Sequence, residues 1–235
     1  MTITIPSYKR AGKVTTLQFL DGAFRKEEII IGTQTTEDYE EYQEFYGSCA
    51  TVIYKEAHSV SENRNNLLEY CHIHGITECL QLDDDISCIM TMHKSKLKGE
   101  AFKELMQSCF DVCRKNNVVM FGGYCCSNPF MMKATAKPNI IVGMLCGILD
   151  TSLRYDTTFR IKEDYELSLR LMSQGKNVIR FNSFGAEAKH KTSGGCSEDW
   201  NAPDYQKWAD ILVDAYPTLV KHNNKRKGEI LFIGK

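Results

Sequence analysis

The chain has 235 residues, of which 43% are hydrophobic and 25% are charged, and its formal net charge is −1. This length suits one large α/β domain or two very small ones, and the composition excludes a mainly disordered or low-complexity protein. The near-neutral charge argues against a protein that coats nucleic acid, but it is compatible with an enzyme that touches nucleic acid through a local basic patch.

In chain order, strands and helices are expected to alternate. The predicted strands are Thr2–Pro6, Glu28–Gly32, Ala50–Tyr54, Glu78–Leu82, Val118–Phe121, Asn139–Leu149 and Asn177–Phe181. The predicted helices between them are Lys13–Phe19, Thr36–Tyr46, Ser61–His74, Gly99–Asn116 and Glu163–Gln174. Ser61 is the expected N-cap of its helix, and Gly75 ends that helix.

This alternation predicts an α/β fold with a Rossmann-like, mostly parallel central sheet flanked by helices. We expect one domain over residues 1–235, with a core at about 2–195 and a C-terminal helical tail at about 200–235. The spacing of the large apolar residues in the tail predicts an amphipathic helix that packs on the core: Trp200, Tyr205, Trp208, Leu212 and Tyr216. Covering a substrate site is the alternative role for this tail.

Neither a membrane span nor a targeting segment is expected. The apolar stretch at residues 140–149 is shorter than the ~18 residues that a membrane helix needs. The segment Met1–Pro6 lacks the basic and apolar regions of a signal peptide. Ten cysteines are scattered without a Cys-x-x-Cys pair, which predicts reduced core thiols, and hence a cytoplasmic protein, rather than a disulfide framework or a zinc site.

Three adjacent aspartates follow the predicted strand Glu78–Leu82. Asp83, Asp84 and Asp85 repel one another, and Mg²⁺ or Mn²⁺ would relieve this repulsion and could bridge to a diphosphate. An acidic turn or a helix N-cap explains the same residues without any ligand. Because ligands of open α/β sheets bind at the carboxyl ends of the strands, the position after a strand favours the metal interpretation.

Two further acids begin a helix. Glu163 and Asp164 lie in the first turn of the helix at residues 163–174, where they complement the helix dipole without needing another role. The functional alternative is a general base, or an acid that binds the hydroxyl group of an acceptor.

Two polar segments in the first third of the chain could contact a nucleotide or its phosphates. In the segment Pro6–Arg10, Tyr8 is placed to stack on a nucleotide base, and Lys9 or Arg10 to face phosphates. Arg64, near a helix start, offers a guanidinium to a carboxylate or a diphosphate. The alternatives are an ordinary basic loop and a structural ion pair.

A basic loop follows the predicted strand Asn177–Phe181. Within residues 187–195, His190 is a candidate metal ligand, and Lys189 and Lys191 are candidates for neutralising phosphate charge. A solvated basic loop is the alternative.

The order of these motifs resembles the GT-A glycosyltransferases over residues 2 to 195. The resemblance is carried by a Pro-Ser-Tyr-x-Arg loop, an Arg-Asn helix start, a strand ending in Asp-Asp-Asp, a Glu-Asp helix start and a later His. Within that class, Leu82–Ile86 and Ile5–Arg10 are similar to the small TET- and base-J-associated glycosyltransferases. Those enzymes are found largely in phages and act on hydroxymethylated pyrimidines in DNA.

The resemblance implies a role for each matching residue. The donor, a nucleoside-diphosphate sugar such as a UDP-sugar, is expected at Pro6, Ser7, Tyr8, Arg10, Arg64, Asp83, Asp84, Lys189 and Lys191. The metal ion, Mn²⁺ or Mg²⁺, is expected at Asp85, Asp83 and His190. Asp164, with Glu163 beside it, matches the acid that takes the proton from the attacking hydroxyl group in an inverting enzyme. The family's Glu-Asp-x-Asp motif ends here in Glu166, which leaves the base open among these three carboxylates.

We therefore expect a metal-dependent glycosyltransferase that moves a sugar to the hydroxymethyl group of a modified pyrimidine in DNA, in the cytoplasm of a host cell if the chain is phage-encoded. Basic segments at His93–Lys98, Lys133–Lys137 and Lys221–Lys227 would contact the DNA backbone, with solvated surface charge as the alternative. A glycan or protein acceptor, or a sugar-nucleotide-binding protein without activity, are the alternative functions. A nucleotidyltransferase is disfavoured, because only Gly12 lies where its Gly-rich phosphate loop is expected.

Overall fold

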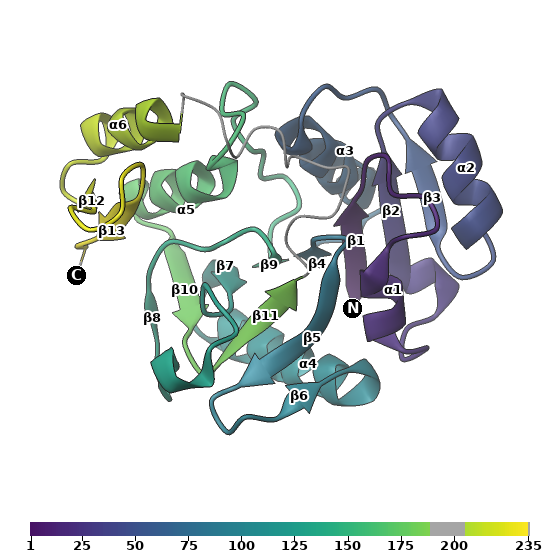
Figure 1. Cartoon of the computed structure of the whole chain (residues 1–235), viewed down its shortest axis with the longest axis horizontal. Helices are drawn as coiled ribbons and strands as arrows, with labels where there is room; N and C mark the ends of the chain where they lie inside the picture. The colour runs from purple at the N-terminus through teal and green to yellow at the C-terminus, as the bar shows by residue number, and fades with distance from the viewer. Residues whose placement is uncertain (189–204, 235) are drawn as a thin grey trace.

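The computed structural model describes residues 1–188 and 205–234, and residues 189–204 and 235 lie outside this description. Its centre is an eight-stranded sheet in the order β3-β2-β1-β4-β9-β7-β10-β8 (Figure 1). The bounds of these strands are β1 Thr2–Pro6, β2 Ile29–Thr33, β3 Thr51–Tyr54, β4 Cys79–Leu82, β7 Val118–Gly122, β8 Ala136–Pro138, β9 Leu145–Ile148 and β10 Asn177–Phe181.

Most neighbouring strands are parallel, as the alternation of strands and helices predicts. The pairs β1–β2, β1–β4, β2–β3 and β7–β10 are parallel. Strand β9 is antiparallel to both β4 and β7, and β8 is an antiparallel edge strand beside β10. The α/β fold with a mostly parallel central sheet is therefore confirmed.

Helices cover both faces of this sheet. They are α1 Thr15–Leu20, α2 Thr36–Tyr46, α3 Val60–Ile73, α4 Gly99–Lys115, α5 Glu163–Ser173 and α6 Tyr205–Ala215, with 3-10 turns η1 Lys26–Glu28 and η2 Pro129–Met131. Ile31 of β2 packs in the apolar cluster that contains α1, α2 and α4, whereas Ile30 packs in the cluster with α3 and α5. Successive strand residues point to opposite faces, so the Ile29–Ile31 run serves both layers.

Several boundaries and elements differ from the predictions. Ser59, not Ser61, caps α3, because the helix begins at Val60 and the Ser59 hydroxyl accepts the Glu62 N–H at 3.2 Å. The predicted strand at residues 139–149 shortens to β9, since the chain before it is irregular although Ile140 and Ile141 are buried.

A second, three-stranded sheet was not predicted. It has the order β11-β5-β6, with β5 Ile86–Thr91, β6 Lys96–Leu97 and β11 Phe184–Ala188. Strand β5 begins directly after the three aspartates, and its first residue, Ile86, pairs with Ala188, the last residue of β11.

The tail contains the predicted helix and two strands that were not predicted. Helix α6 and the hairpin of β12 Val220–His222 and β13 Ile230–Phe232 lie on the α5 side of the molecule (Figure 1). Leu212 and Val220 share an apolar cluster with Leu169 of α5. Trp200 lies outside the described residues.

In the part of the chain that the structure describes, none of the helices combines the length and the apolar character needed to span a bilayer.

Candidate functional site

Two loops from widely separated parts of the chain meet at the carboxyl end of the parallel strands. Strands β1 and β4 pair in parallel, with Thr4 opposite Gln81, so the loops that follow them leave the same edge of the sheet. The Ser7 hydroxyl donates to Asp84 Oδ2 at 2.5 Å, and the Arg10 guanidinium donates to Asp84 Oδ1. The predicted donor loop and the three aspartates therefore form one unit.

The middle aspartate holds this unit together. The Asp84 side chain is 8% exposed, and its two oxygens accept from Ser7 and Arg10. Burial raises the pKa of Asp84, while Arg10 and the Ser7 hydrogen bond oppose that rise. We infer that Asp84, Ser7 and Arg10 position the two loops. Direct contact between these three residues and the donor substrate stays a prediction.

The outer aspartates lie nearer to solvent. The side chain of Asp83 is 33% exposed and that of Asp85 is 17% exposed. Thr16 of α1 fixes the turn that carries them, because its hydroxyl donates to the Asp83 carbonyl at 2.5 Å and accepts the Ile86 N–H at 3.0 Å. Asp85 lies 3.6 Å from the Arg10 guanidinium.

Arg64 connects the aspartate turn to α5. Its guanidinium donates to Asp83 Oδ1 at 2.7 Å and to the Gly143 carbonyl at 3.1 Å, and its Nε lies 3.6 Å from Glu163 Oε1. Burial alone would lower the pKa of Arg64, but the surrounding acids, Asp83 foremost, outweigh burial and raise it. Arg64 is therefore a charged, buried bridge between the two carboxylates, and its predicted contact with the diphosphate stays a prediction.

The first turn of α5 presents two adjacent carboxylates, of which Glu163 is buried and Asp164 is partly buried. Asp164 Oδ2 accepts the Gly143 N–H at 2.6 Å, and Oδ1 accepts the Tyr165 N–H at 2.8 Å. Burial raises the pKa of Asp164, and burial together with Asp164 raises the pKa of Glu163 to about 8. A carboxylate that is oriented by two N–H groups and has a raised pKa suits a general base.

Glu166 lies elsewhere on α5. Its carboxylate accepts from Arg170 Nε at 2.8 Å and from the Tyr216 hydroxyl at 3.2 Å. This pairing directs Glu166 toward the tail, so Glu163 and Asp164 are the stronger candidates for the base.

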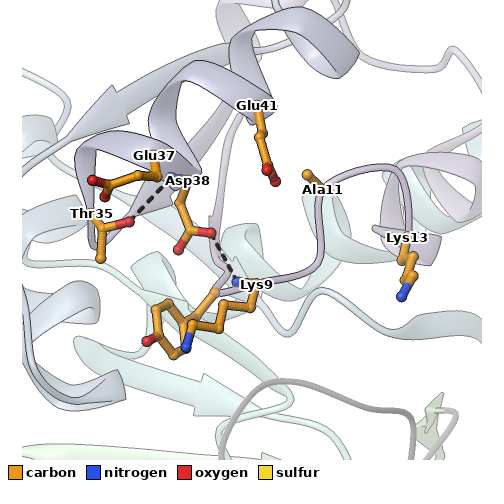
Figure 2. A pocket seen from close by; sticks show the side chains of 8 residues that line it. Lys9, Ala11, Lys13, Thr35, Glu37, Asp38 and Glu41 are labelled. Atoms are coloured by element: carbon orange, nitrogen blue, oxygen red, sulfur yellow. Dashed lines mark hydrogen bonds between the residues drawn. The ribbon is translucent and has the colours of Figure 1, made fainter.

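A cavity of about 550 Å³ opens beside the β1 loop and the start of α2 (Figure 2). Its lining residues are Tyr8, Lys9, Ala11, Lys13, Thr35, Glu37, Asp38 and Glu41. Tyr8 and Lys9 belong to the predicted donor loop, whereas Thr35 and the α2 residues were not predicted as site residues. Their position directly after β2 could have pointed to them, because ligands of open α/β sheets bind at the carboxyl ends of the strands, and this holds for β2 as it does for β1.

Asp38 is the polar centre of this cavity. Its Oδ1 accepts the Lys9 N–H at 3.3 Å, and the Thr35 hydroxyl accepts the Asp38 N–H at 3.1 Å (Figure 2). Its Oδ2 is buried, and no group among the described residues donates to it. Burial raises the pKa of Asp38. A buried acceptor of this kind is suited to a hydroxyl or N–H group of a ligand.

The predicted metal site is only partly within the described residues. Asp83 and Asp85 are hard oxygen donors that Mg²⁺ and Mn²⁺ prefer. Residues 1–188 and 205–234 contain no cluster of three His, Cys, Asp or Glu side chains that could hold a metal ion. The predicted third ligand, His190, lies outside the described residues, as do Lys189 and Lys191. The donor set that is described fits a divalent cation in chemistry but does not complete its coordination.

Comparison with known proteins gives one family. The TET-associated glycosyltransferases match residues 1–195. No curated protein matches the chain at a significant level.

Several solved structures are similar to the chain at low identity. A cytidylyltransferase from Leptospira borgpetersenii has 12% identity and a TM-score of 0.48, with 92% of this chain and 94% of that chain covered. A protein from Desulfovibrio desulfuricans described as a nucleotide-diphospho-sugar transferase has 12% identity and a TM-score of 0.48, with 92% and 99% covered. A UDP-glucose pyrophosphorylase complexed with UDP-glucose has 10% identity and a TM-score of 0.42, with 79% and 91% covered.

The family match spans most of the chain and contains both the aspartate turn and the first turn of α5. The chain therefore belongs to the TET-associated glycosyltransferases, and it is a glycosyltransferase.

Proposed function

We propose that this enzyme transfers a sugar from a nucleoside-diphosphate sugar to the hydroxymethyl group of a modified pyrimidine in DNA, with Mn²⁺ or Mg²⁺. One observation carries the proposal: Arg64 joins Asp83 of the aspartate turn to Glu163 of the α5 carboxylate pair, so the donor-side and acceptor-side acids belong to one network. A transfer reaction needs both sides within reach of one sugar.

The nucleoside part of the donor is assigned to the cavity beside α2. Its volume of about 550 Å³ is in the range of small-molecule sites. Tyr8 supplies an aromatic ring, and the unsatisfied Asp38 Oδ2 supplies an acceptor for a ribose hydroxyl or a base N–H. The diphosphate would then extend toward Asp83 and Asp85.

The metal ion is assigned to Asp85 and Asp83, with His190 as the third ligand. When bound, it would neutralise the charge that develops on the departing nucleoside diphosphate. Lys189 and Lys191 are assigned the role of neutralising the same charge. Strand β11 supports these assignments, because its last residue, Ala188, pairs with Ile86 next to Asp85, and the basic segment follows directly.

Asp164 is assigned as the base of an inverting reaction. The acceptor oxygen forms a bond to the anomeric carbon, and its proton passes to Asp164. The bond between that carbon and the diphosphate oxygen breaks, and the electron pair leaves with the nucleoside diphosphate. Gly143 and Tyr165 orient Asp164 through their N–H groups, and Glu163 lies beside it. Glu163 in turn lies 3.6 Å from Arg64 Nε through its Oε1.

A contact next to two of the three basic segments supports the DNA acceptor. Lys94, at the tip of the β5–β6 hairpin, lies with Nζ 4.6 Å from the ring centre of Phe130 in η2. Residues 93–98 and 128–138, which we call the hairpin–η2 surface, contain five lysines and no Asp or Glu. Phe130 is 81% exposed. A lysine beside an exposed aromatic ring, with other lysines nearby in the sequence, suits a phosphate backbone with an unstacked base.

The test is a screen of nucleotide sugars with Mn²⁺ in the presence and absence of hydroxymethylated DNA. We expect nucleoside-diphosphate release that the modified DNA stimulates and that unmodified DNA does not, together with mass gain on the DNA. Release of nucleoside diphosphate that DNA does not affect would contradict the proposed DNA acceptor and point to a glycan or a protein acceptor. Absence of release from every donor would contradict the transfer itself and favour a sugar-nucleotide-binding protein.

A further inference from the structure

Lys162 is an unusual residue immediately before the Glu163–Asp164 pair. Its backbone is left-handed, with φ 65°, and its carbonyl accepts the Glu166 N–H at 2.9 Å at the start of α5. Its side chain is only 3% exposed. A lysine is rarely buried without partners, so its surroundings must compensate for the lost hydration.

The C-terminal segment 205–234 supplies two of its three partners, Tyr205 and Glu229, and α5 supplies Tyr165. Lys162 Nζ lies 4.0 Å from the ring centre of Tyr205 in α6, and 4.8 Å from that of Tyr165. Glu229, at the end of the β12–β13 turn, holds Nζ at 3.5 Å through Oε2 and accepts the Tyr205 hydroxyl at 2.7 Å through Oε1. We call Tyr165, Tyr205 and Glu229 the lysine cage.

A second contact from the same segment reaches the other side of the carboxylate pair. The hydroxyl of Tyr216, just after α6, donates to Glu166 at 3.2 Å. The C-terminal segment thus holds Lys162 before the pair and Glu166 after it. Burial raises the pKa of Asp164, and the Gly143 N–H, Arg64, the Tyr165 N–H and the positive charge of Lys162 oppose that rise.

We propose that the C-terminal segment positions the acceptor-side carboxylates through the lysine cage, with Lys162 as the positioning residue. This proposal rests on the proposed function. The family match ends at residue 195, so the cage residues Tyr205 and Glu229 lie beyond it, although both contact the residue that precedes the carboxylate pair. No residue of the aspartate turn belongs to the cage: the turn is held by Ser7, Arg10 and Thr16, and it connects to α5 through Arg64.

The test separates positioning from folding and from donor binding. The variants are Lys162→Met, Tyr205→Phe and Glu229→Gln. Asp214→Asn is the control, because Asp214 is an exposed acid on α6, the helix that carries Tyr205. We expect the three cage variants to lower kcat for transfer by about 10- to 100-fold, as small misplacements of catalytic groups do. The Kd of the nucleoside diphosphate should change by less than about twofold, as only the acceptor side moves. The control should behave as wild type.

A pH profile gives the readout that a purely structural role would not alter. Removing the positive charge in Lys162→Met should shift the acidic limb of the kcat profile to higher pH, because Asp164 then stays protonated up to a higher pH. Lys162→Arg, which keeps the charge, should restore the limb. Equal losses of donor affinity, Tm and kcat, or an unchanged kcat and pH profile, would overturn the proposal.

Hydrogen exchange keeps the proposal testable if wild type transfers no sugar, an outcome that would count against the proposed function alone. We expect Lys162→Met and Glu229→Gln to accelerate exchange at the amides of residues 163–167 and not at those of residues 83–88. Unchanged protection of residues 163–167 in both variants would overturn the positioning role, whatever the activity.

Discussion

Three identical side chains in sequence have three different surroundings. Asp84 faces Ser7 and Arg10 in the interior, Asp83 contacts Arg64, and Asp85 lies near Arg10 with more exposure than Asp84. The chemistry of a carboxylate at this position is therefore decided by which way the turn directs it, and Thr16 sets that direction through two hydrogen bonds.

The outer aspartate and the α5 aspartate should separate binding from transfer. In Asp85→Ala we expect loss of Mn²⁺-dependent binding of nucleoside diphosphate, because one metal ligand is removed. In Asp164→Asn we expect binding to persist and transfer to fall by about 100-fold or more, since an amide cannot accept the proton. Calorimetry with nucleoside diphosphate and Mn²⁺, and a transfer assay, check the pair. Unchanged metal-dependent binding in Asp85→Ala would show that the metal assignment is wrong.

The raised pKa of Glu163 predicts a pH dependence of stability. Burial, and then Asp164, raise this pKa from 4.5 to about 8, so between these values the folded state binds a proton that the unfolded state has lost. The free energy of unfolding should therefore fall as the pH rises from about 4.5 to about 8, and level off above it. Denaturant titrations in the presence of a chelator measure this slope. Glu163→Gln should reduce it, and an equal slope in that variant would contradict the assignment.

At the scale of elements, the core helices and the parallel strands were predicted within two residues at each end, since their apolar periodicity is local. Helix α2 and the strands β1 and β10 have the predicted bounds. Strands β5 and β11 were missed although they are as long as the predicted strands, because their pairing joins residues about a hundred positions apart. Such pairing leaves no periodic signal in either segment alone.

The β5–β6 hairpin and η2 carry a prediction of their own. Lys94→Gln and Phe130→Ala should each weaken binding to DNA, because the first removes a phosphate contact and the second a stacking surface. The lysine variant should reduce the salt slope of binding by about 1, and the Phe130 variant should leave that slope unchanged. Fluorescence anisotropy at several salt concentrations measures both. Lys115→Gln, an exposed lysine at the end of α4, is the matched control; equal effects of all three variants would contradict a specific surface.

At the scale of the whole molecule, the candidate site joins four distant parts of the chain through Arg64. Its guanidinium contacts Asp83 after β4, Gly143 before β9, and Glu163 at the start of α5. The antiparallel strand β9 makes this possible, because it lies between β4 and β7 and brings Gly143 to the carboxyl end of β4. The backbone of Gly143 then serves Arg64 with its carbonyl and Asp164 with its N–H.

Gly143 should accordingly tolerate no side chain. A Cβ added there would lie 2.8 Å from Arg64 Nη2, so Gly143→Ala must displace a buried guanidinium. We expect the free energy of unfolding to fall by about 1–3 kcal/mol, as for other overpacked positions. Transfer should fall more than nucleoside-diphosphate binding, because Arg64 and Asp164 lose alignment together. Urea unfolding, calorimetry and the transfer assay test this, and a variant with wild-type stability and transfer would contradict the bridging role of Arg64.

The α/β class, most strands and helices of the core, and the residue types of the candidate site can be predicted from the amino-acid sequence, because periodicity, capping residues and strand-end motifs are local properties of the chain. Four features became visible in the folded chain alone: which of three aspartates is turned inward, that Arg64 bridges the two acid groups, that Asp38 is the centre of a cavity, and that the tail encloses Lys162. These features depend on contacts between residues far apart in sequence, whose burial and pairing arise only when the sheet and its loops assemble.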